Sequence, residues 1–326
     1  MHVLITGGGG FLGQKLAAAL AEQGVLADAC GRLRAITGLT LLDIGHAAAP
    51  VDAPFPVEHI AADLSESTAL AAALASEPLL VVHLAAVVSS AAEADFDLGM
   101  RVNVDGTRQL LDACRTLQHP PRFVFASSIA AYGDTGGAPV TDRTALMPRS
   151  SYGIQKAIGE LLVVDYHRRG FIDGLAVRLP TITVRPGRPN QAASSFASSI
   201  LREPLQGETA VLPVPTDLAM YVQSPRTAVA NLVHAAALPS SALDERRRLM
   251  LPGLRVTVAE MLEALQRAGG DAALQRVQPQ ADAEITRIVG SWPADFALDW
   301  ASSLGFERDT DIDSIVQIFQ EDDLLS

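Results

Sequence analysis

A tyrosine and a lysine stand four residues apart in the segment YGIQK, at Tyr152 and Lys156. On a helix this spacing places both side chains on one face. A nearby ammonium favours the phenolate, so we expect Lys156 to lower the pKa of Tyr152. Such a tyrosine can remove the proton from a substrate hydroxyl while a hydride leaves for a nicotinamide. Lys156 is one of only two lysines in a chain that otherwise uses arginine as its basic residue.

Two serines, Ser127 and Ser128, end the apolar run RFVFASS that precedes the expected helix. A doubly wound sheet binds its ligands at the carboxyl ends of its strands, so a serine there can hold the substrate oxygen. A tyrosine and a lysine at this spacing also occur on ordinary amphipathic surface helices. The catalytic interpretation therefore depends on whether the chain also binds a nicotinamide cofactor.

A glycine-rich loop at the start of the chain predicts such a cofactor site. Gly7, Gly10 and Gly13 lie in TGGGGFLG, between an apolar run at 2–6 and a helical segment rich in Ala and Leu. Glycines here allow a tight turn and a close approach of the backbone to a pyrophosphate, which the helix N-terminus then stabilises. Because the loop directly follows the first strand, dinucleotide binding is the favoured interpretation.

Acidic residues at the ends of the next two strands indicate which dinucleotide binds. Asp43 can accept both ribose hydroxyls of NAD and would repel a 2′-phosphate, so we favour NAD. Arg32 and Arg34, which precede that strand, leave NADP open. Asp63 and Leu64 suit the adenine amino group and ring, although a helix N-cap is an equally open interpretation of Asp63.

Strands and helices alternate over the first 180 residues. This alternation predicts an α/β fold with a doubly wound parallel sheet of the Rossmann type. No segment predicts a hairpin, and 25–38 is expected to be an irregular insertion. The expected strands are 2–6, 39–43, 57–64, 78–86, 122–128 and 174–180, and the expected helices are 11–24, 67–76, 93–118 and 150–169.

The alternation breaks after residue 181, where Pro and Gly become frequent. Helices are still expected at 226–238, at 256–270 and at 312–320, and the first of these is expected to pack on the main sheet. The acidic side chains at 321–323 are expected to be exposed to solvent. We therefore expect two parts. They are an NAD-binding Rossmann domain, 1–180 with 226–245, and a smaller C-terminal substrate-binding lobe, 181–225 with 246–326.

Composition excludes several classes of function. The chain has 326 residues and a net charge of −12, which argues against nucleic acid as a partner. The N-terminus has no basic segment of the kind found in secretion signals, and the longest apolar run is too short to span a membrane. We therefore expect a cytoplasmic protein that is not bound to a membrane. The histidines show no metal-ligand spacing, so no metal is expected, and His83 is expected to be a packed core residue.

Taken together, these segments resemble the extended short-chain dehydrogenase/reductase family, which includes NAD-dependent epimerases and dehydratases. The resemblance implies that Ser128, Tyr152 and Lys156 are catalytic and that Lys156 also holds the nicotinamide ribose. It implies a homodimer formed through 93–118 and 150–169. The matching segments are TGGGGFLG, Asp43, Asp63-Leu64, HLAA, VNVDGT, FASSIAAYG, YGIQK and VRLPT. Further cofactor contacts implied by the resemblance are Phe11, Leu12, Leu84, Ala85, Ala86, Pro180 and, as a structural helper, Asn103.

Three interpretations of the function remain open, because family membership does not give the substrate. A sugar-nucleotide epimerase or dehydratase is disfavoured, since the segment after VRLPT has no Asn before Asn190 and no Asp-Glu pair lies near Ser128. A non-catalytic NAD(H) sensor is disfavoured because such members typically lose the Tyr or the Lys.

The favoured substrate is a small sugar acid. Segments 177–208 and 87–99 resemble those of NAD-dependent dehydrogenases that oxidise the 2-hydroxyl of a four-carbon sugar acid. A carboxylate substrate needs an arginine, and Arg185 or Arg188 could supply it, whereas Arg178 is expected to be structural. The remaining candidate substrate contacts are Ser89, Ser90, Ser128 and Asn190.

Overall fold

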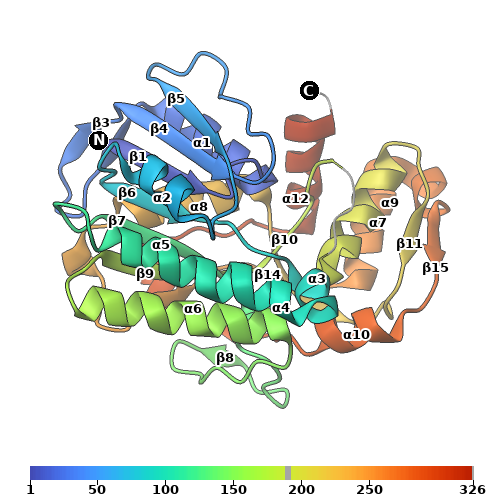
Figure 1. Cartoon of the computed structure of the whole chain (residues 1–326). Coiled ribbons are helices and arrows are strands. Elements are labelled where there is room, and N and C mark those ends of the chain that lie inside the picture. The colour runs from blue at the N-terminus through green and yellow to red at the C-terminus, as the bar shows by residue number, and fades with distance from the viewer. Residues whose placement is uncertain (188–191, 325–326) are drawn as a thin grey trace.

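The computed structural model describes residues 1–187 and 192–324. Its centre is a seven-stranded parallel sheet in the order β13-β9-β7-β6-β1-β4-β5 (Figure 1). After β5 the chain crosses back to place β6 beside β1, and open parallel sheets bind ligands at such a switch point. The strands are β1 (His2–Thr6), β4 (Gly38–Asp43), β5 (Val57–Ala61), β6 (Leu80–His83), β7 (Arg122–Ser128), β9 (Asp173–Leu179) and β13 (Arg248–Met250).

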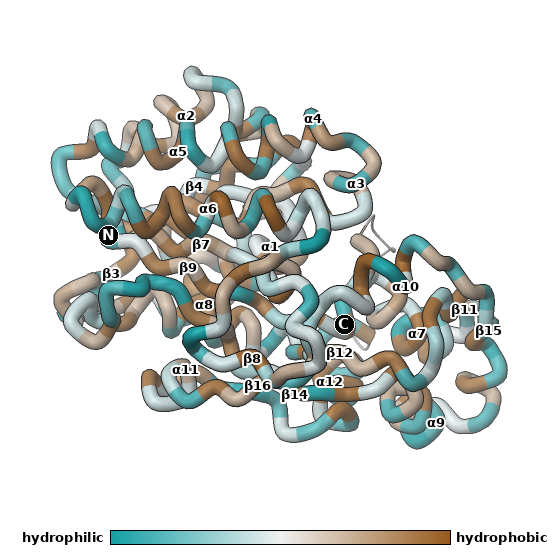
Figure 2. Tube along the Cα trace, turned by 90° about the horizontal axis from the view of Figure 1, so that it is seen from below, coloured by the Kyte–Doolittle hydropathy of each residue, from teal (hydrophilic) through white to brown (hydrophobic). Residues whose placement is uncertain are grey.

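Helices cover both faces of this sheet, which confirms the doubly wound fold. Side chains alternate along β1, so Val3 and Ile5 pack under α1 and α8 while Leu4 faces α2, α5 and α6. Figure 2 shows apolar and polar residues alternating along α5 and α6. These helices are α1 (Phe11–Gln23), α2 (Ser67–Leu74), α5 (Thr107–Cys114), α6 (Ser151–Arg168) and α8 (Pro225–Ala237).

The expectations for the segments 25–38 and 93–118 were wrong. The stretch 25–38 contains an antiparallel hairpin of β2 (Val25–Ala27) and β3 (Leu33–Ala35), closed by the Asp28 carboxylate, which accepts the backbone N–H of Arg32 at 3.0 Å. The segment 93–118 is not one helix. It is divided into α3 (Ser89–Ala94), α4 (Phe96–Gly99), a π-helical segment η1 (Met100–Gly106) and α5.

A second part, here called the C-terminal lobe, has its own apolar core. Its sheets are β10-β12-β14 and β11-β15. Their strands are β10 (Thr181–Ile182), β11 (Ala210–Leu212), β12 (Ala219–Gln223), β14 (Leu254–Thr257) and β15 (Val277–Pro279). Its helices are α7 (Phe196–Leu205), α9 (Val258–Leu274), α10 (Ala283–Gly290) and α12 (Ile312–Phe319). The short elements β8 (Val140–Thr141), β16 (Phe296–Ala297) and α11 (Trp300–Ser303) lie along its border with the large sheet.

The boundary between the two parts differs from the expected residue ranges. Strand β13 lies in the range expected for the lobe but completes the large sheet beside β9. The acids expected to be solvated are paired instead. Asp323 contacts Lys15 of α1 at 2.7 Å, and Glu321 contacts Arg226 of α8 at 2.9 Å. Within the described residues no helix is both long and apolar enough to cross a bilayer.

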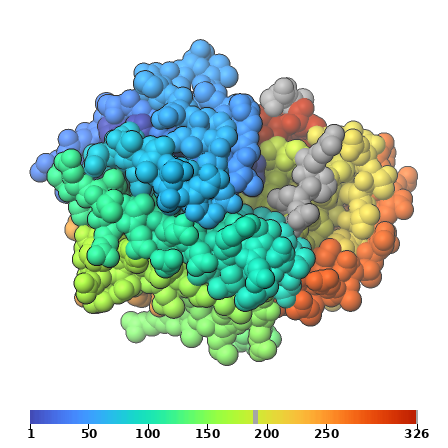
Figure 3. Space-filling model, viewed as in Figure 1, coloured from blue at the N-terminus to red at the C-terminus, as the bar shows by residue number. Residues whose placement is uncertain are grey.

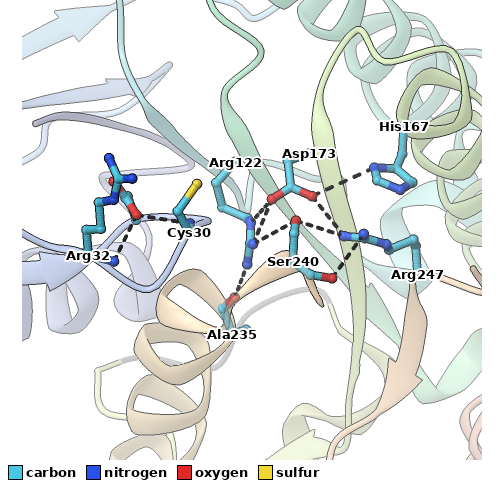
Figure 4. A network of polar contacts seen from close by, with 9 residues as sticks. Cys30, Arg32, Arg122, His167, Asp173, Ala235, Ser240 and Arg247 are labelled. Atoms are coloured by element: carbon cyan, nitrogen blue, oxygen red, sulfur yellow. Dashed lines mark hydrogen bonds and ion pairs between the residues drawn. The ribbon is translucent and has the colours of Figure 1, made fainter. Parts of the chain in front are cut away.

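A network of charged side chains ties together the starts of β7, β9 and β13 (Figure 4). Asp173 accepts hydrogen bonds from Arg122 and from Arg247, each at 2.8 Å, and both arginines also donate to Ser240. Arg122 further donates to the carbonyl of Ala235 at the end of α8. Burial would raise the pKa of Asp173, but the arginines and Ser240 hold it below its usual value. The network therefore fixes the edge of the sheet opposite the carboxyl ends of the strands.

We expect Asp173→Asn to lower the free energy of unfolding by about 3 kcal/mol near neutral pH, because it leaves two buried arginines unpaired. The depressed pKa means that the carboxylate stabilises the fold above about pH 4. This contribution is lost as the pH falls through the folded-state pKa, so the difference between the two proteins should shrink in acid. Urea denaturation at several pH values measures it.

Asp165→Asn is the matched control, since Asp165 pairs with Arg168 on the surface, where both side chains are more than half exposed. Its effect should stay below about 1 kcal/mol. Equal effects of the two substitutions would contradict the structural role given to Asp173.

Candidate active site

The glycine loop between β1 and α1 is too tightly packed for side chains. Gly7 has a φ of 73°, and a Cβ there would lie 2.7 Å from the backbone nitrogen of Ala85. A Cβ on Gly13 would lie 2.2 Å from the carbonyl oxygen of Gly7. Helix α1 starts after Gly10 without a side-chain cap, so its first N–H groups are available to an anion. The loop thus has the form that a pyrophosphate requires.

A cavity of about 380 Å³ lies beside this loop at the ends of β1, β4, β5 and β6. Its size and mixed lining suit an adenosine. Its walls include Asp43 and Asp63, and the N–H and hydroxyl of Ser65 hold the pKa of Asp63 below its usual value, against the effect of burial. The predicted residues that line it are Gly7, Gly10, Asp43, Asp63, Leu64, Leu84, Ala85 and Ala86, and sequence reasoning missed Arg101 among others.

Asp43 is positioned by the loop that it faces. Its carboxylate accepts the N–H of Gly9 at 3.0 Å and that of Gly45 at 2.9 Å. Arg32 and Arg34, which left NADP open, lie on the β2–β3 hairpin at the start of β4, about 17 Å of strand away from Asp43. Arg34 is paired there with Asp28 at 2.9 Å. The residues at the ribose end of the cavity therefore fit NAD.

A second cavity, of about 290 Å³, continues from the first toward α6. Both cavities are lined by Gly7, Gly10, Leu84 and Ala86, so one elongated space runs from Asp43 to Tyr152 and Lys156. This extended shape fits a dinucleotide, with the nicotinamide end at α6. The predicted residues that line the second cavity also include Phe11, Leu12, Gly13, Ser128, Tyr152, Lys156 and Pro180.

Tyr152 and Lys156 lie together on α6, but their electrostatics differ from the expectation. Burial raises the pKa of Tyr152, while the charge of Arg185 and a hydrogen bond with Ser128 oppose that rise. The predicted lowering by Lys156 was wrong, because burial dominates. Burial also lowers the pKa of Lys156 to about 7, against the effect of Glu160. The lysine donates to the carbonyl of Ala126 at 2.8 Å.

The structure separates the two candidate serines. Ser127 is buried and donates to the Glu160 carboxylate at 2.5 Å, so its hydroxyl is already used. Ser128 lines the cavity with Tyr152, to which its side chain is hydrogen-bonded, and its hydroxyl also accepts the N–H of Ala130 at 3.2 Å. Ser128, unlike Ser127, therefore lies beside Tyr152 at the cavity.

Asn103 is placed to position the site rather than to line it. It lies in the π-helical segment, which often marks functional positions. Its side chain accepts the N–H of Val87 at 2.8 Å and donates to the carbonyl of the same residue at 3.0 Å. It also donates to Gln155 of α6 at 2.7 Å. Asn103 thus links the backbone after β6 to the helix that carries Tyr152, as a structural helper should.

His83, at the end of β6, is a core residue. Its ring nitrogens bond to Thr6 at 2.6 Å and to Thr107 at 2.9 Å. Burial lowers its pKa to about 3, with the charge of Lys156 adding to the effect. The ring therefore stays neutral and takes no part in proton transfer near neutral pH.

A third, smaller cavity of about 60 Å³ lies between Tyr152 and residues of the C-terminal lobe. The face in Figure 3 is hollowed between the blue amino-terminal part and the yellow and orange lobe. Ser89 lines this small cavity while accepting the N–H of Ala193 at 2.9 Å, so its own proton remains available. Arg185 lines it too, with its guanidinium 5.4 Å from the centre of the Phe11 ring.

The other substrate-contact predictions have different outcomes. Ser90 is not among the described residues that line the cavity. Arg188 and Asn190 lie outside the described residues. Sequence reasoning missed Ser194 and Trp292, which also line it. No motif marks either of them, because they come from parts of the chain where the regular alternation has ended.

Comparison with known proteins is consistent with this geometry. Residues 3–235 match the model of the NAD dependent epimerase/dehydratase family. The chain is 51% identical to the D-erythronate dehydrogenase of Cupriavidus necator, over 99% of this chain and 98% of that protein. It is 44% identical to the D-erythronate dehydrogenase of Haemophilus influenzae, over 99% and 100% of the two chains. A crystal structure described as a nucleoside-diphosphate-sugar epimerase from Agrobacterium tumefaciens is 42% identical, with a TM-score of 0.92 over 99% of this chain and 94% of that one.

We expect Asp43→Asn to reduce the preference for NADH over NADPH by about tenfold or more, because it removes the charge that repels a 2′-phosphate. The asparagine oxygen can still accept a loop N–H, so NADH should continue to bind. Dissociation constants from the fluorescence of the two reduced cofactors measure this.

Asp28→Asn is the control, since Asp28 sits beside the hairpin arginines. It should leave the preference unchanged. A shift in preference with Asp28→Asn but not with Asp43→Asn would reverse the assignment of the ribose site.

Proposed function

Because the chain belongs to the NAD dependent epimerase/dehydratase family, we propose that it is an NAD-dependent dehydrogenase of a small sugar acid. The proposed reaction oxidises the 2-hydroxyl of D-erythronate to the 2-oxo acid. Two relatives covered almost end to end by this chain bear the name D-erythronate dehydrogenase. The resemblance seen in segments 177–208 and 87–99 supports the same substrate.

The proposed chemistry assigns each catalytic side chain one task. When bound, NAD accepts the hydride from the substrate carbon. Tyr152 accepts the proton of the substrate hydroxyl, and Ser128 holds the same oxygen by a hydrogen bond. Lys156, which lines the same cavity, would orient the cofactor ribose. Since burial raises the pKa of Tyr152, oxidation should become faster as the pH rises.

Arg185 is the proposed partner of the substrate carboxylate. It lines both the nicotinamide end of the long cavity and the small cavity. Its guanidinium is held by a bond from Nε to the carbonyl of Ile182 at 3.0 Å, which leaves its terminal nitrogens for a bidentate contact. Its backbone is held as well, because Arg202 donates to the Arg185 carbonyl at 2.6 Å.

The observation that carries the proposal is the small volume next to the catalytic pair. Sites for drug-sized ligands usually measure about 300–1,000 Å³. The described residues leave about 60 Å³ beyond Tyr152, in a space that Arg185 makes cationic. Such a space suits a short acid whose carboxylate meets the Arg185 guanidinium. The epimerase alternative is kept because of the description of the Agrobacterium tumefaciens structure.

We also propose a cytoplasmic homodimer. Ile154 and Leu161 on α6 and Phe96 on α4 are exposed apolar side chains, which suits pairing across a two-fold axis. The two cysteines, Cys30 and Cys114, are unpaired, as expected in a reducing compartment.

NADH formation tests the function directly. Purified protein with NAD is mixed separately with D-erythronate, L-threonate, a six-carbon aldonate and a UDP-hexose. We expect NADH to accumulate with D-erythronate at the highest kcat/KM. An altered UDP-hexose without net NADH would instead establish the epimerase alternative and overturn the proposal.

Tyr152→Phe should lower kcat by at least about a hundredfold, because it removes the general base. NADH binding should stay within about threefold, since the ring remains. Tyr166→Phe is the control on the same helix, because Tyr166 binds Asp112 at 2.5 Å, away from the cavities. Full activity in Tyr152→Phe would exclude the proposed mechanism.

A further inference from the structure

One of the residues that line the small cavity is an aromatic residue of the C-terminal lobe. Trp292 follows α10, and its backbone N–H bonds to the carbonyl of Val289 at 3.0 Å. Among the described residues that line the cavity, Trp292 alone comes from beyond Ser194. The size of the space next to Tyr152 therefore depends on where the lobe holds this ring.

Packing holds the ring from two directions. Trp292 contacts the core of the C-terminal lobe, and it also contacts a separate cluster that includes Ile129 and Tyr132 beside the catalytic serine. Its indole N–H is buried and meets no acceptor among the residues that the structure describes. Buried indole N–H groups usually have a partner. The ring is thus placed by shape alone, and a smaller side chain there would break no side-chain hydrogen bond.

The helix before Trp292 is tied to the start of the catalytic helix. Arg287 of α10 pairs with Glu93 of α3 at 3.4 Å. The same carboxylate accepts the backbone N–H of Ser151, the residue before Tyr152, at 2.9 Å. One side chain therefore connects the helix behind the wall with the helix that carries the base.

We propose that Trp292 sets the chain-length limit of the enzyme, its ring closing the cavity at the end of a four-carbon acid. The inference rests on the proposed function. Arg185 and the catalytic pair would hold the carboxylate and the reacting carbon at one end of the cavity. Each additional hydroxymethylene group would then extend the far end of the substrate into the ring. Steric exclusion of one carbon unit in such a pocket changes kcat/KM by about 10- to 200-fold.

The test compares D-erythronate with five-carbon and six-carbon aldonates of the same configuration at carbon 2. In Trp292→Leu, the ratio of kcat/KM for the five-carbon acid to that for D-erythronate should rise at least about tenfold. Trp292→Phe, which disturbs packing less, should give a smaller rise in the same direction. Melting temperature and NADH affinity show that both variants are folded.

Trp300→Leu is the matched control, because Trp300 is the other tryptophan and packs at the far border of the lobe under Arg246. It should leave the ratio unchanged. An equal ratio in folded Trp292→Leu, Trp292→Phe and Trp300→Leu would overturn the proposal while leaving the dehydrogenase function intact.

Calorimetric titration of the same acids into protein saturated with NADH separates the two claims. Acids that bind without being oxidised would overturn the proposed function, and their relative affinities in Trp292→Leu would still decide the length limit. If the unaltered protein neither binds nor oxidises any acid, both proposals fail.

Discussion

The geometry of the active site depends on a buried ion pair between Glu160 of α6 and Arg178 of β9. Arg178 donates through Nε at 2.8 Å and through a terminal nitrogen at 2.6 Å, and its other terminal nitrogen binds the hydroxyl of Tyr132 at 2.7 Å. Breaking such a pair from one side leaves an uncompensated buried charge, which costs about 3–5 kcal/mol. The pair therefore fixes the depth and rotation of α6. The pair therefore also positions Lys156 and Tyr152, which lie one and two helical turns before Glu160 on α6.

The same pair shapes the charge of the site. Glu160 and Arg178 neutralise each other, and Ser127 completes the carboxylate's hydrogen bonds. Lys156 and Arg185 are then left as the positive groups that line the cavity. This resolves the apparent conflict between a net charge of −12 and an acidic substrate. Local cations in a partly desolvated space act more strongly on a bound carboxylate than distant surface charges, which salt screens.

Sequence reasoning brought together residues that the structure also places together where the signal is a short spacing within one strand, loop or helix. The glycine loop, Asp43 and the Tyr152–Lys156 pair are of this kind, and the structure brings them to one elongated space. It failed where burial or long-range contacts decide. The direction of the Tyr152 pKa follows from burial, which no local pattern shows.

The remaining differences have similar causes. Ser127 is withdrawn from the site by Glu160, which is distant in sequence. The expected helix 93–118 is broken at Asp95, where the backbone is extended, and its middle is a π-helical segment that contains Asn103. Trp292 lines the cavity and packs against the cluster that includes Ile129 and Tyr132, and nothing near it in the sequence marks this position.

The two parts of the molecule are tied together unequally. The strongest tie is Asp309, a buried carboxylate of the lobe that accepts the N–H and hydroxyl of Ser224 and the hydroxyl of Thr227 at the N-terminus of α8. A negative charge at that end of a helix is stabilised by the helix dipole. By contrast, the contact between α10 and α3 is a single pair in which the Arg287 side chain is more than half exposed, and such pairs add little stability. The part of the lobe that carries Trp292 is therefore held to the helices of the large sheet less firmly than the part that carries Asp309.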